Sequence, residues 1–105
     1  MRLKSDFVVA ALIRRCGTEL VPAVLRRRGS PEAGAIFVKV DRLDGTADLY
    51  GPAPQALLAE DAGDRLFAPV LVGATPLDVE ERVRKEIRFD PDLWLVEVDD
   101  RQGRH

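Results

Sequence analysis

Four residues on two neighbouring segments have side chains that could bind an anion together. They are three cations and one aromatic ring: Arg26, Arg28, Lys39 and Phe37. Both segments alternate in period two, and the pleat of a strand puts Arg26 and Arg28 on one face and Arg27 on the other. Cations beside an aromatic ring suit the phosphates and bases of nucleic acid, or another polyanion. The competing interpretation is a solvated strand face whose cations pair with Glu97 and Asp99.

A glycine-bounded loop, GSPEAG at residues 29–34, joins these two segments. Phosphate-binding loops place converging backbone N–H groups at the start of a helix, with spacings such as GxxxxGK(S/T) or GxGxxG. This loop has neither spacing, precedes a strand-like segment, and carries Glu32, which would repel an anion. We therefore predict a structural hairpin turn between two antiparallel strands.

Three further sets of residues have the types but not the pattern of a functional site. Asp41, Asp44 and Asp48 surround one turn, yet the alternating ligands and distal glutamate of a calcium loop are missing. Cys16 falls on the apolar side of a helical pattern, where a thiol is an inert small hydrophobe. His105 is the only histidine and stands at a chain end. We predict no catalytic residue, no cofactor and no metal.

Two helices are expected to flank the strands that carry these residues. Apolar residues at helical spacing predict a helix over residues 6–16, with Ser5 as its cap and Gly17 as its end. The stretch TPLD at residues 75–78 is a helix start signal, with a capping threonine, a proline in the first turn and an acid near the third position. That second helix is expected to reach about residue 88.

Period-two alternation predicts five strands. They are VPAVLRRR, AIFVKVDRL, ADLY, RLFAPVLVG and LWLVEV, at residues 21–28, 35–43, 47–50, 65–73 and 93–98. Pro69 cannot donate to a ladder, so its strand is expected at an edge or a bulge.

The element order α-β-β-β-β-α-β indicates an α+β fold. We expect a mostly antiparallel sheet of about five strands with two helices on one face. That arrangement would leave the other face, with Phe37, Val24, Leu93 and Leu95, open to a partner.

Composition indicates one globular domain over residues 1–105. The chain has 46% hydrophobic and 32% charged residues, with a formal net charge of -2. Its apolar runs fall short of the roughly 18 residues that a membrane helix needs. A single cysteine excludes an internal disulfide, and we expect a cytoplasmic protein without a membrane partner.

Three long strings carry a resemblance to a known family. They are MRLKSDFVVAALIRRC, GAIFVKVDRLDGTADLYGPAP and EIRFDPDLWLVEVDDRQGRH. Through them the chain resembles the bacterial family catalogued as domain of unknown function 1491. The resemblance implies a small cytoplasmic α+β domain and supplies no catalytic residues.

Three functional hypotheses follow. The first is an uncharacterised, non-enzymatic protein-interaction or regulatory module whose partner is another protein or a second copy of itself, as a homodimer through the open face or the edge near Pro69. The alternative is nucleic-acid or polyanion binding through Arg26, Arg28 and Lys39. The third is an enzyme with a site under the loop of residues 51–64, using a carboxylate such as Asp48 or Glu60.

Overall fold

The computed structural model describes residues 4–53 and 67–102, and its elements follow the expected order. Helix α1 spans Ser5–Thr18 and helix α2 spans Pro76–Phe89. The strands are β1 (Ala23–Arg27), β2 (Ile36–Asp41), β3 (Ala47–Pro52), β4 (Phe67–Ala74) and β5 (Trp94–Asp99). The predicted α+β fold, with its five-stranded and mostly antiparallel sheet, is confirmed.

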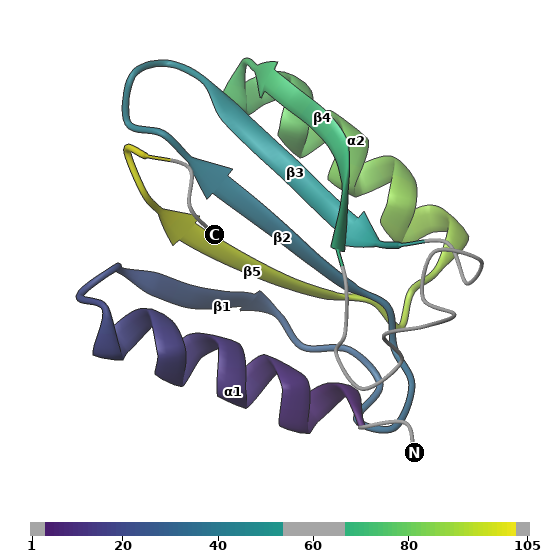
Figure 1. Ribbon diagram of the computed structural model, residues 1–105. Coiled ribbons are helices and arrows are strands. Elements are labelled where there is room, and N and C mark those ends of the chain that lie inside the picture. The colour runs from purple at the N-terminus through teal and green to yellow at the C-terminus, as the bar shows by residue number, and fades with distance from the viewer. Residues whose placement is uncertain (1–3, 54–66, 103–105) are drawn as a thin grey trace.

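The strand order of the sheet differs from the order in the sequence. The strands lie side by side as β1-β5-β2-β3-β4 (Figure 1). β5 is antiparallel to β1 and parallel to β2, whereas β2, β3 and β4 form an antiparallel meander. The prediction that β1 and β2 form a hairpin is therefore wrong, because β5 lies between them. The loop of residues 29–34 instead passes over the start of β5.

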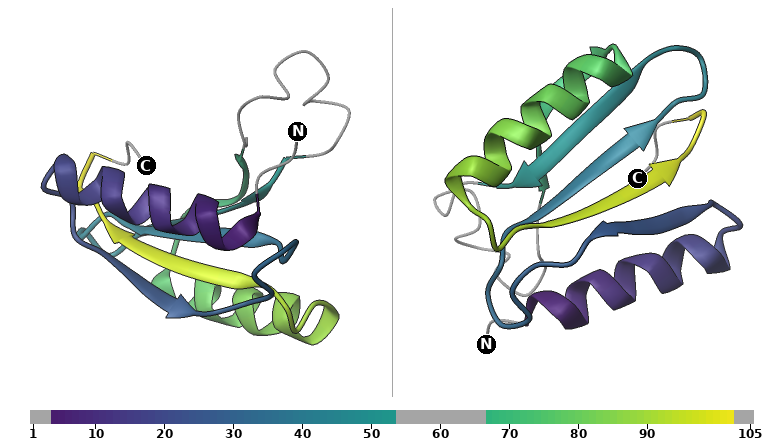
Figure 2. Two further views of the ribbon diagram at one scale, coloured as in Figure 1. Left: turned by 90° about the horizontal axis from the view of Figure 1, so that it is seen from below. Right: turned by 180° about the vertical axis from the view of Figure 1, so that it is seen from behind.

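The two helices cover opposite faces of the sheet, which corrects the prediction of two helices on one face. α1 packs against a cluster that includes Val38 and Val96, and α2 packs against one that includes Phe37 and Leu95. Figure 2 shows the sheet between the helices. The physical reason is that β2 and β5 carry apolar side chains on both faces, and each face needs a cover.

The predicted open face is consequently not open. Phe37, Leu93 and Leu95 are buried on the α2 side of the sheet. Val24, the fourth member of that set, is 56% exposed. It lies on β1, at the edge of the sheet farthest from β4.

The loop of residues 29–34 supports the start of α1. Backbone N–H groups of Ser5 and Asp6 donate to loop carbonyl oxygens at 3.3 and 3.0 Å. The Ser5 hydroxyl does not cap the helix as expected, because it donates to the carbonyl oxygen of Gly34 at 2.6 Å. A Cβ atom at Gly29 or Gly34 would collide with the carbonyl oxygen of Asp92. The glycines thus permit close passage of the loop over the chain that enters β5.

Helix α1 runs past the predicted stop at Gly17. The chain leaves the helix at Leu20, which has a φ of 60°. The N–H of Val21 then donates to the carbonyl oxygen of Cys16 at 2.8 Å, which closes the end of the helix. A leucine therefore occupies a left-handed position that usually holds glycine.

Helix α2 begins where the sequence predicts. The Thr75 side chain accepts a hydrogen bond from the backbone N–H of Asp78 at 3.1 Å, and Pro76 lies in the first turn. Each helix has 14 residues. Within residues 4–53 and 67–102, neither is long and apolar enough to cross a membrane.

Strand β4 forms one edge of the sheet, as expected for the strand that contains Pro69. Its pairing with β3 shifts register twice, and one shift lies between the pairs that Leu71 and Pro69 make with β3. Near the other shift, Gly73 has a φ of 64°. Pro69 is therefore both on an edge strand and at an irregularity, which confirms the prediction.

Candidate functional site

Four charged side chains meet on the α2 side of the sheet. Arg26 comes from β1, Lys39 from β2, Glu97 from β5 and Glu80 from α2. We call this set the Glu80 network. The Arg26 guanidinium donates two hydrogen bonds to Glu80, from Nη1 to Oε2 at 2.6 Å and from Nη2 to Oε1 at 3.0 Å. Its Nη1 also donates to Glu97 Oε1 at 2.9 Å, and Lys39 Nζ donates to Glu80 Oε2 at 2.7 Å.

The Glu80 network neutralises a lysine that is almost fully buried. The Lys39 side chain is 6% exposed, and its ammonium lies 4.0 Å from Glu97 as well as in contact with Glu80. Hydrogen bonds from Arg26 are the largest cause of a Glu80 pKa lowered to about 2, against the opposing effect of burial. The same contact raises the pKa of Arg26 further. Without these carboxylates the buried ammonium would be strongly unfavourable.

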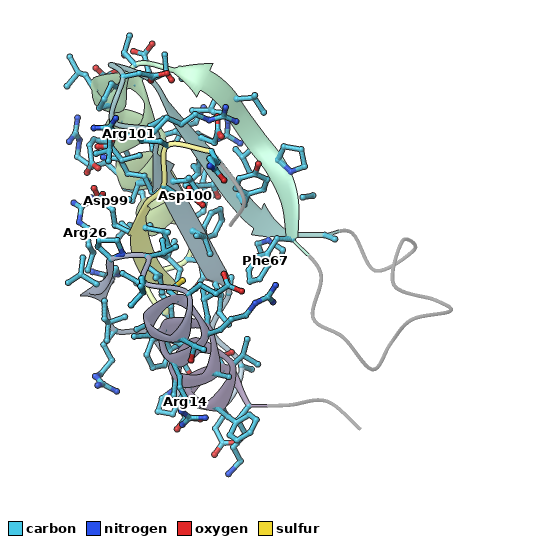
Figure 3. The ribbon with its side chains drawn as sticks, turned by 60° about the vertical axis from the view of Figure 1, so that its left-hand side comes forward. Arg14, Arg26, Phe67, Asp99, Asp100 and Arg101 are labelled. Atoms are coloured by element: carbon cyan, nitrogen blue, oxygen red, sulfur yellow. The ribbon has the colours of Figure 1, made fainter. Side chains whose placement is uncertain are left out.

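The residues predicted to contact an anion do not share one exposed surface. Arg26 and Lys39 are paired within the network, and Phe37 is buried. Arg28 lies over the ring of Trp94, 5.5 Å from its centroid. Figure 3 shows Arg26 on one side of the sheet and Phe67 on the other. Carboxylates therefore pair with two of the three predicted cations, Arg26 and Lys39. The carboxylates are Glu80 and the expected Glu97.

The sequence did not identify Glu80 as the partner of Arg26, because a nearer cation on the same helix was available to it. On an isolated helix, Glu80 and Arg84 are spaced as a stabilising i,i+4 pair. In the structure Glu80 bonds to the sheet instead, and the ion pair within α2 is Arg82 with Glu86 at 2.8 Å. Only the strand order, with β1 next to β5, brings Arg26 close to this helix.

Asp48 was considered as a catalytic carboxylate, and its oxygens are already occupied. The residue is fully buried, and Oδ2 accepts from Arg42 Nε at 2.9 Å and Nη2 at 2.7 Å. Oδ1 accepts from the backbone N–H of Gly73 at 2.8 Å. The hydrogen bonds to the Asp48 carboxylate raise the pKa of Arg42. Asp48 thus ties the β2–β3 turn to β4, while Glu60 lies outside the described residues.

A second group of carboxylates meets at the ends of β2 and β5. One oxygen each of Asp41, Glu97 and Asp99 lies within 4.8 Å of the others. The parallel pairing of β2 and β5, which sets Asp41 opposite Asp99, was not expected from the sequence. A cation here would compete with Arg26 for Glu97. The three aspartates that the sequence places around one turn, Asp41, Asp44 and Asp48, do not form such a group among the described residues.

The single thiol is shielded. Cys16 is buried in the cluster beneath α1, and burial is the largest cause of its raised pKa. A thiol of this kind is a poor nucleophile near neutral pH. His105 lies outside the described residues.

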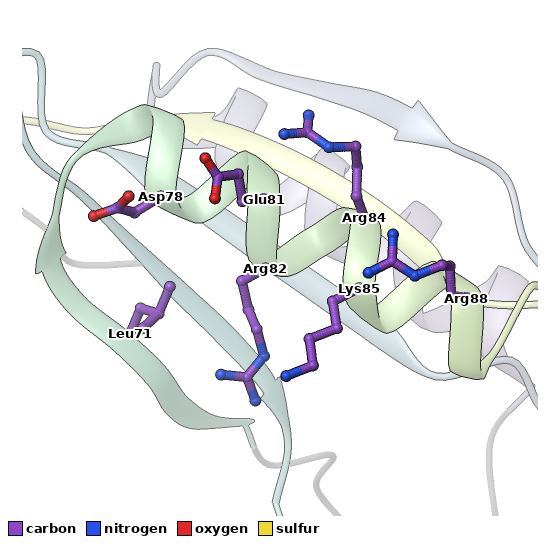
Figure 4. Close-up of a pocket in the computed structure, with 7 residues that line it drawn as sticks. All are labelled: Leu71, Asp78, Glu81, Arg82, Arg84, Lys85 and Arg88. Atoms are coloured by element: carbon purple, nitrogen blue, oxygen red, sulfur yellow. The ribbon is translucent and has the colours of Figure 1, made fainter.

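The outer surface of α2 carries a shallow hollow with many charges. It is lined by Leu71, Asp78, Glu81, Arg82, Arg84, Lys85 and Arg88. In Figure 4, Arg84 and Arg88 project along one flank of the helix, while Arg82 and Lys85 extend together along the other. The sequence RVRK at residues 82–85 was the available signal for this surface.

Comparison with known proteins gives one family and several close structures. The family described as "Protein of unknown function (DUF1491)" matches residues 3–105. A solution structure of a protein from A. tumefaciens is 40% identical, covers 94% of this chain and 86% of that chain, and has a TM-score of 0.82. No curated protein matches the chain.

Two further similar structures are of DUF1491 family proteins from Caulobacter crescentus. The crystal structure is 38% identical with a TM-score of 0.82, and the NMR structure is 39% identical with a TM-score of 0.81. Each alignment covers 100% of this chain and 92% of the other. At this identity and coverage the likeness extends over the whole fold.

Proposed function

The chain belongs to the DUF1491 family, and from that premise we propose that it is a non-enzymatic interaction module that associates with a second copy of itself. The observation that carries the proposal is the exposed apolar surface of β4 on the side of the sheet that α1 covers only in part. In this proposal the protein works in the cytoplasm, as its single cysteine suggests.

The exposed surface follows from where α1 lies. α1 sits beside β1, at the edge of the sheet opposite β4 (Figures 1 and 2). Tyr50 and Phe67 border the cluster under α1 and are only half-buried. Pro69 is exposed, and Val72 is 65% exposed. We call these four residues the β4 surface. An apolar side chain as open as Val72, beside other partly open apolar groups, is typical of a contact surface.

A second copy of the chain is the partner that this surface favours. Most soluble homo-oligomers close about a two-fold axis, in which the same surface on each subunit meets itself. Pro69 and the two register shifts hinder strand pairing across the β4 edge, because they interrupt its row of hydrogen-bonding groups. The contact is therefore a packing of two β4 surfaces face to face, and not a continuation of the sheet.

Light scattering coupled to size-exclusion chromatography tests this proposal. We expect a dimer for the unmodified protein and a monomer for Val72→Asp, because two buried carboxylates would oppose the contact. The matched control is Val24→Asp, since Val24 is similarly exposed on the opposite edge strand. The proposal is overturned if the unmodified protein is a monomer at high concentration, or if both variants associate as it does.

Polyanion binding is the second candidate function. Its support no longer lies on the sheet, where Arg26 and Lys39 are paired, but on those cations of α2 that pair with no acid in the described part of the chain. The enzyme hypothesis receives no such support, because the Asp48 carboxylate is held by Arg42 and Gly73.

A further inference from the structure

Positive charge is concentrated in the second half of α2, in a chain whose formal net charge is -2. Residues 82–89 read RVRKEIRF, with four cations and one carboxylate. Residues 76–81 read PLDVEE, with three carboxylates and no cation. This order agrees with the helix macrodipole, which favours acids at the start of a helix and cations at its end. The dipole alone, however, does not account for the aromatic side chain that accompanies these cations.

Most of these cations have no acidic partner within residues 4–53 and 67–102. Arg82 pairs with Glu86, whereas Arg84, Lys85 and Arg88 are exposed and form no ion pair with any described acid. They differ in this from Arg26, Lys39 and Arg42, whose charges are used inside the fold. Three unpaired cations on two turns of helix create a positive potential that attracts an anionic partner.

An exposed aromatic ring completes this surface. Phe89 is 80% exposed, although α2 buries Val79 and Val83 against the sheet. At 100° per residue, Arg82, Lys85 and Phe89 fall on the same flank of the helix, and Phe89 follows Lys85 by four residues. Figure 4 shows the ends of the Arg82 and Lys85 side chains close together on that flank. We call Arg82, Arg84, Lys85, Arg88 and Phe89 the α2 basic surface.

We infer that the α2 basic surface binds single-stranded nucleic acid. Lys85 contacts a backbone phosphate, an unpaired base stacks on Phe89, and Arg84 and Arg88 strengthen the positive field from the other flank. Base stacking on an aromatic side chain needs an exposed ring and an exposed base, which a duplex does not offer. A membrane fits less well, because the apolar side of α2 is already packed against the sheet and cannot enter lipid.

This inference is independent of self-association. Leu71 packs with the α2 cluster, so the pleat sets its neighbour Val72 on the other side of β4. A monomeric protein that binds nucleic acid, or a dimer that does not, would separate the two proposals.

Fluorescence anisotropy with labelled single-stranded RNA and DNA oligonucleotides tests the inference. We expect binding at low salt that weakens as salt rises, with a logarithmic slope of about -0.7 for each phosphate contacted. The variant Arg84→Ala/Lys85→Ala/Arg88→Ala should lose at least about tenfold in affinity. Phe89→Ala should weaken binding by roughly tenfold, since stacking contributes on the order of 1–3 kcal/mol per base.

Two controls separate this surface from general charge and from a simple polyanion site. Arg14→Ala/Arg15→Ala/Arg101→Ala makes the same change in net charge at exposed residues outside α2, and it should bind nearly as the unmodified protein does. Heparin provides negative charge without bases, so its binding should not change in Phe89→Ala. The inference is overturned if neither oligonucleotide binds at low salt, if both triple variants lose affinity equally, or if Phe89→Ala binds single strands normally.

Discussion

The Arg26 guanidinium holds the Glu80 carboxylate in a bidentate pair, at 2.6 and 3.0 Å, and so connects an edge strand to a helix packed over the other half of the sheet. Bidentate arginine–carboxylate pairs are the strongest ordinary ion pairs, because two charge-assisted hydrogen bonds fix one geometry. Here the pair also completes the shielding of Lys39.

Replacing Glu80 by glutamine should destabilise the protein by about 2 kcal/mol, because the largely buried Lys39 ammonium loses its closest carboxylate. Urea unfolding at pH 7 measures the change. Glu81→Gln is the matched control, since Glu81 is the exposed neighbour on the same helix and should alter stability by less than about 0.5 kcal/mol. Equal stability of the two variants would contradict a structural role for the network.

Acid should weaken the unmodified protein through the same residue. The pKa of Glu80 is about 2 in the folded protein, below its ordinary 4.5. A depressed pKa adds stability that is present above pH 4.5 and is lost as the pH falls toward 2. Urea midpoints measured between pH 6 and pH 2 should therefore decline less steeply in Glu80→Gln than in the unmodified protein. Parallel curves for the two proteins would rule out this contribution.

Gly34→Ala should be among the most damaging single substitutions, costing about 3 kcal/mol or more, because the added methyl group would collide with the Asp92 carbonyl. Gly17→Ala makes the same chemical change inside α1, where a Cβ meets nothing within 4 Å. It should stabilise the protein by up to about 1 kcal/mol. Thermal unfolding of the two variants checks both directions, and a neutral Gly34→Ala would show that the loop can move away from β5.

Leu20→Gly should raise stability by about 1 kcal/mol, because the left-handed φ of 60° is strained for leucine and free for glycine. The Leu20 side chain is 89% exposed, so little packing is lost. Leu20→Ala is the control: it removes the side chain but keeps the strain, and its unfolding midpoint should stay close to that of the unmodified protein. A lower midpoint for Leu20→Gly would mean that the leucine makes a contact worth more than the strain.

Local signals in the sequence predicted the elements well and their arrangement only in part. The start of α2 at Thr75 and Pro76 depends on contacts within one turn, and it was predicted correctly. The strands were recognised because period-two alternation is also a local pattern. The position of β5 depends instead on pairing between residues about 60 apart, such as Ile36 with Trp94, and no local pattern carries that information.

One signal for the arrangement was nevertheless present. The runs IFV and LWLV are apolar at consecutive positions, and the corresponding residues of β2 and β5 are buried on both faces. Uninterrupted apolar runs are typical of central strands covered on both sides. They predict helices on opposite faces, and from that placement the burial of Phe37 and the contact between α2 and Lys39 would follow.

The place of β5 has a consequence for synthesis of the chain. The strand that fills the gap between β1 and β2 is the last of the sheet to leave the ribosome, so a nascent chain carries two unpaired strand edges until residues 94–99 emerge. Premature termination before Trp94 would remove the centre of the sheet and not merely its margin. Chains truncated before residue 94 should therefore expose these strand edges and be prone to aggregation and proteolysis.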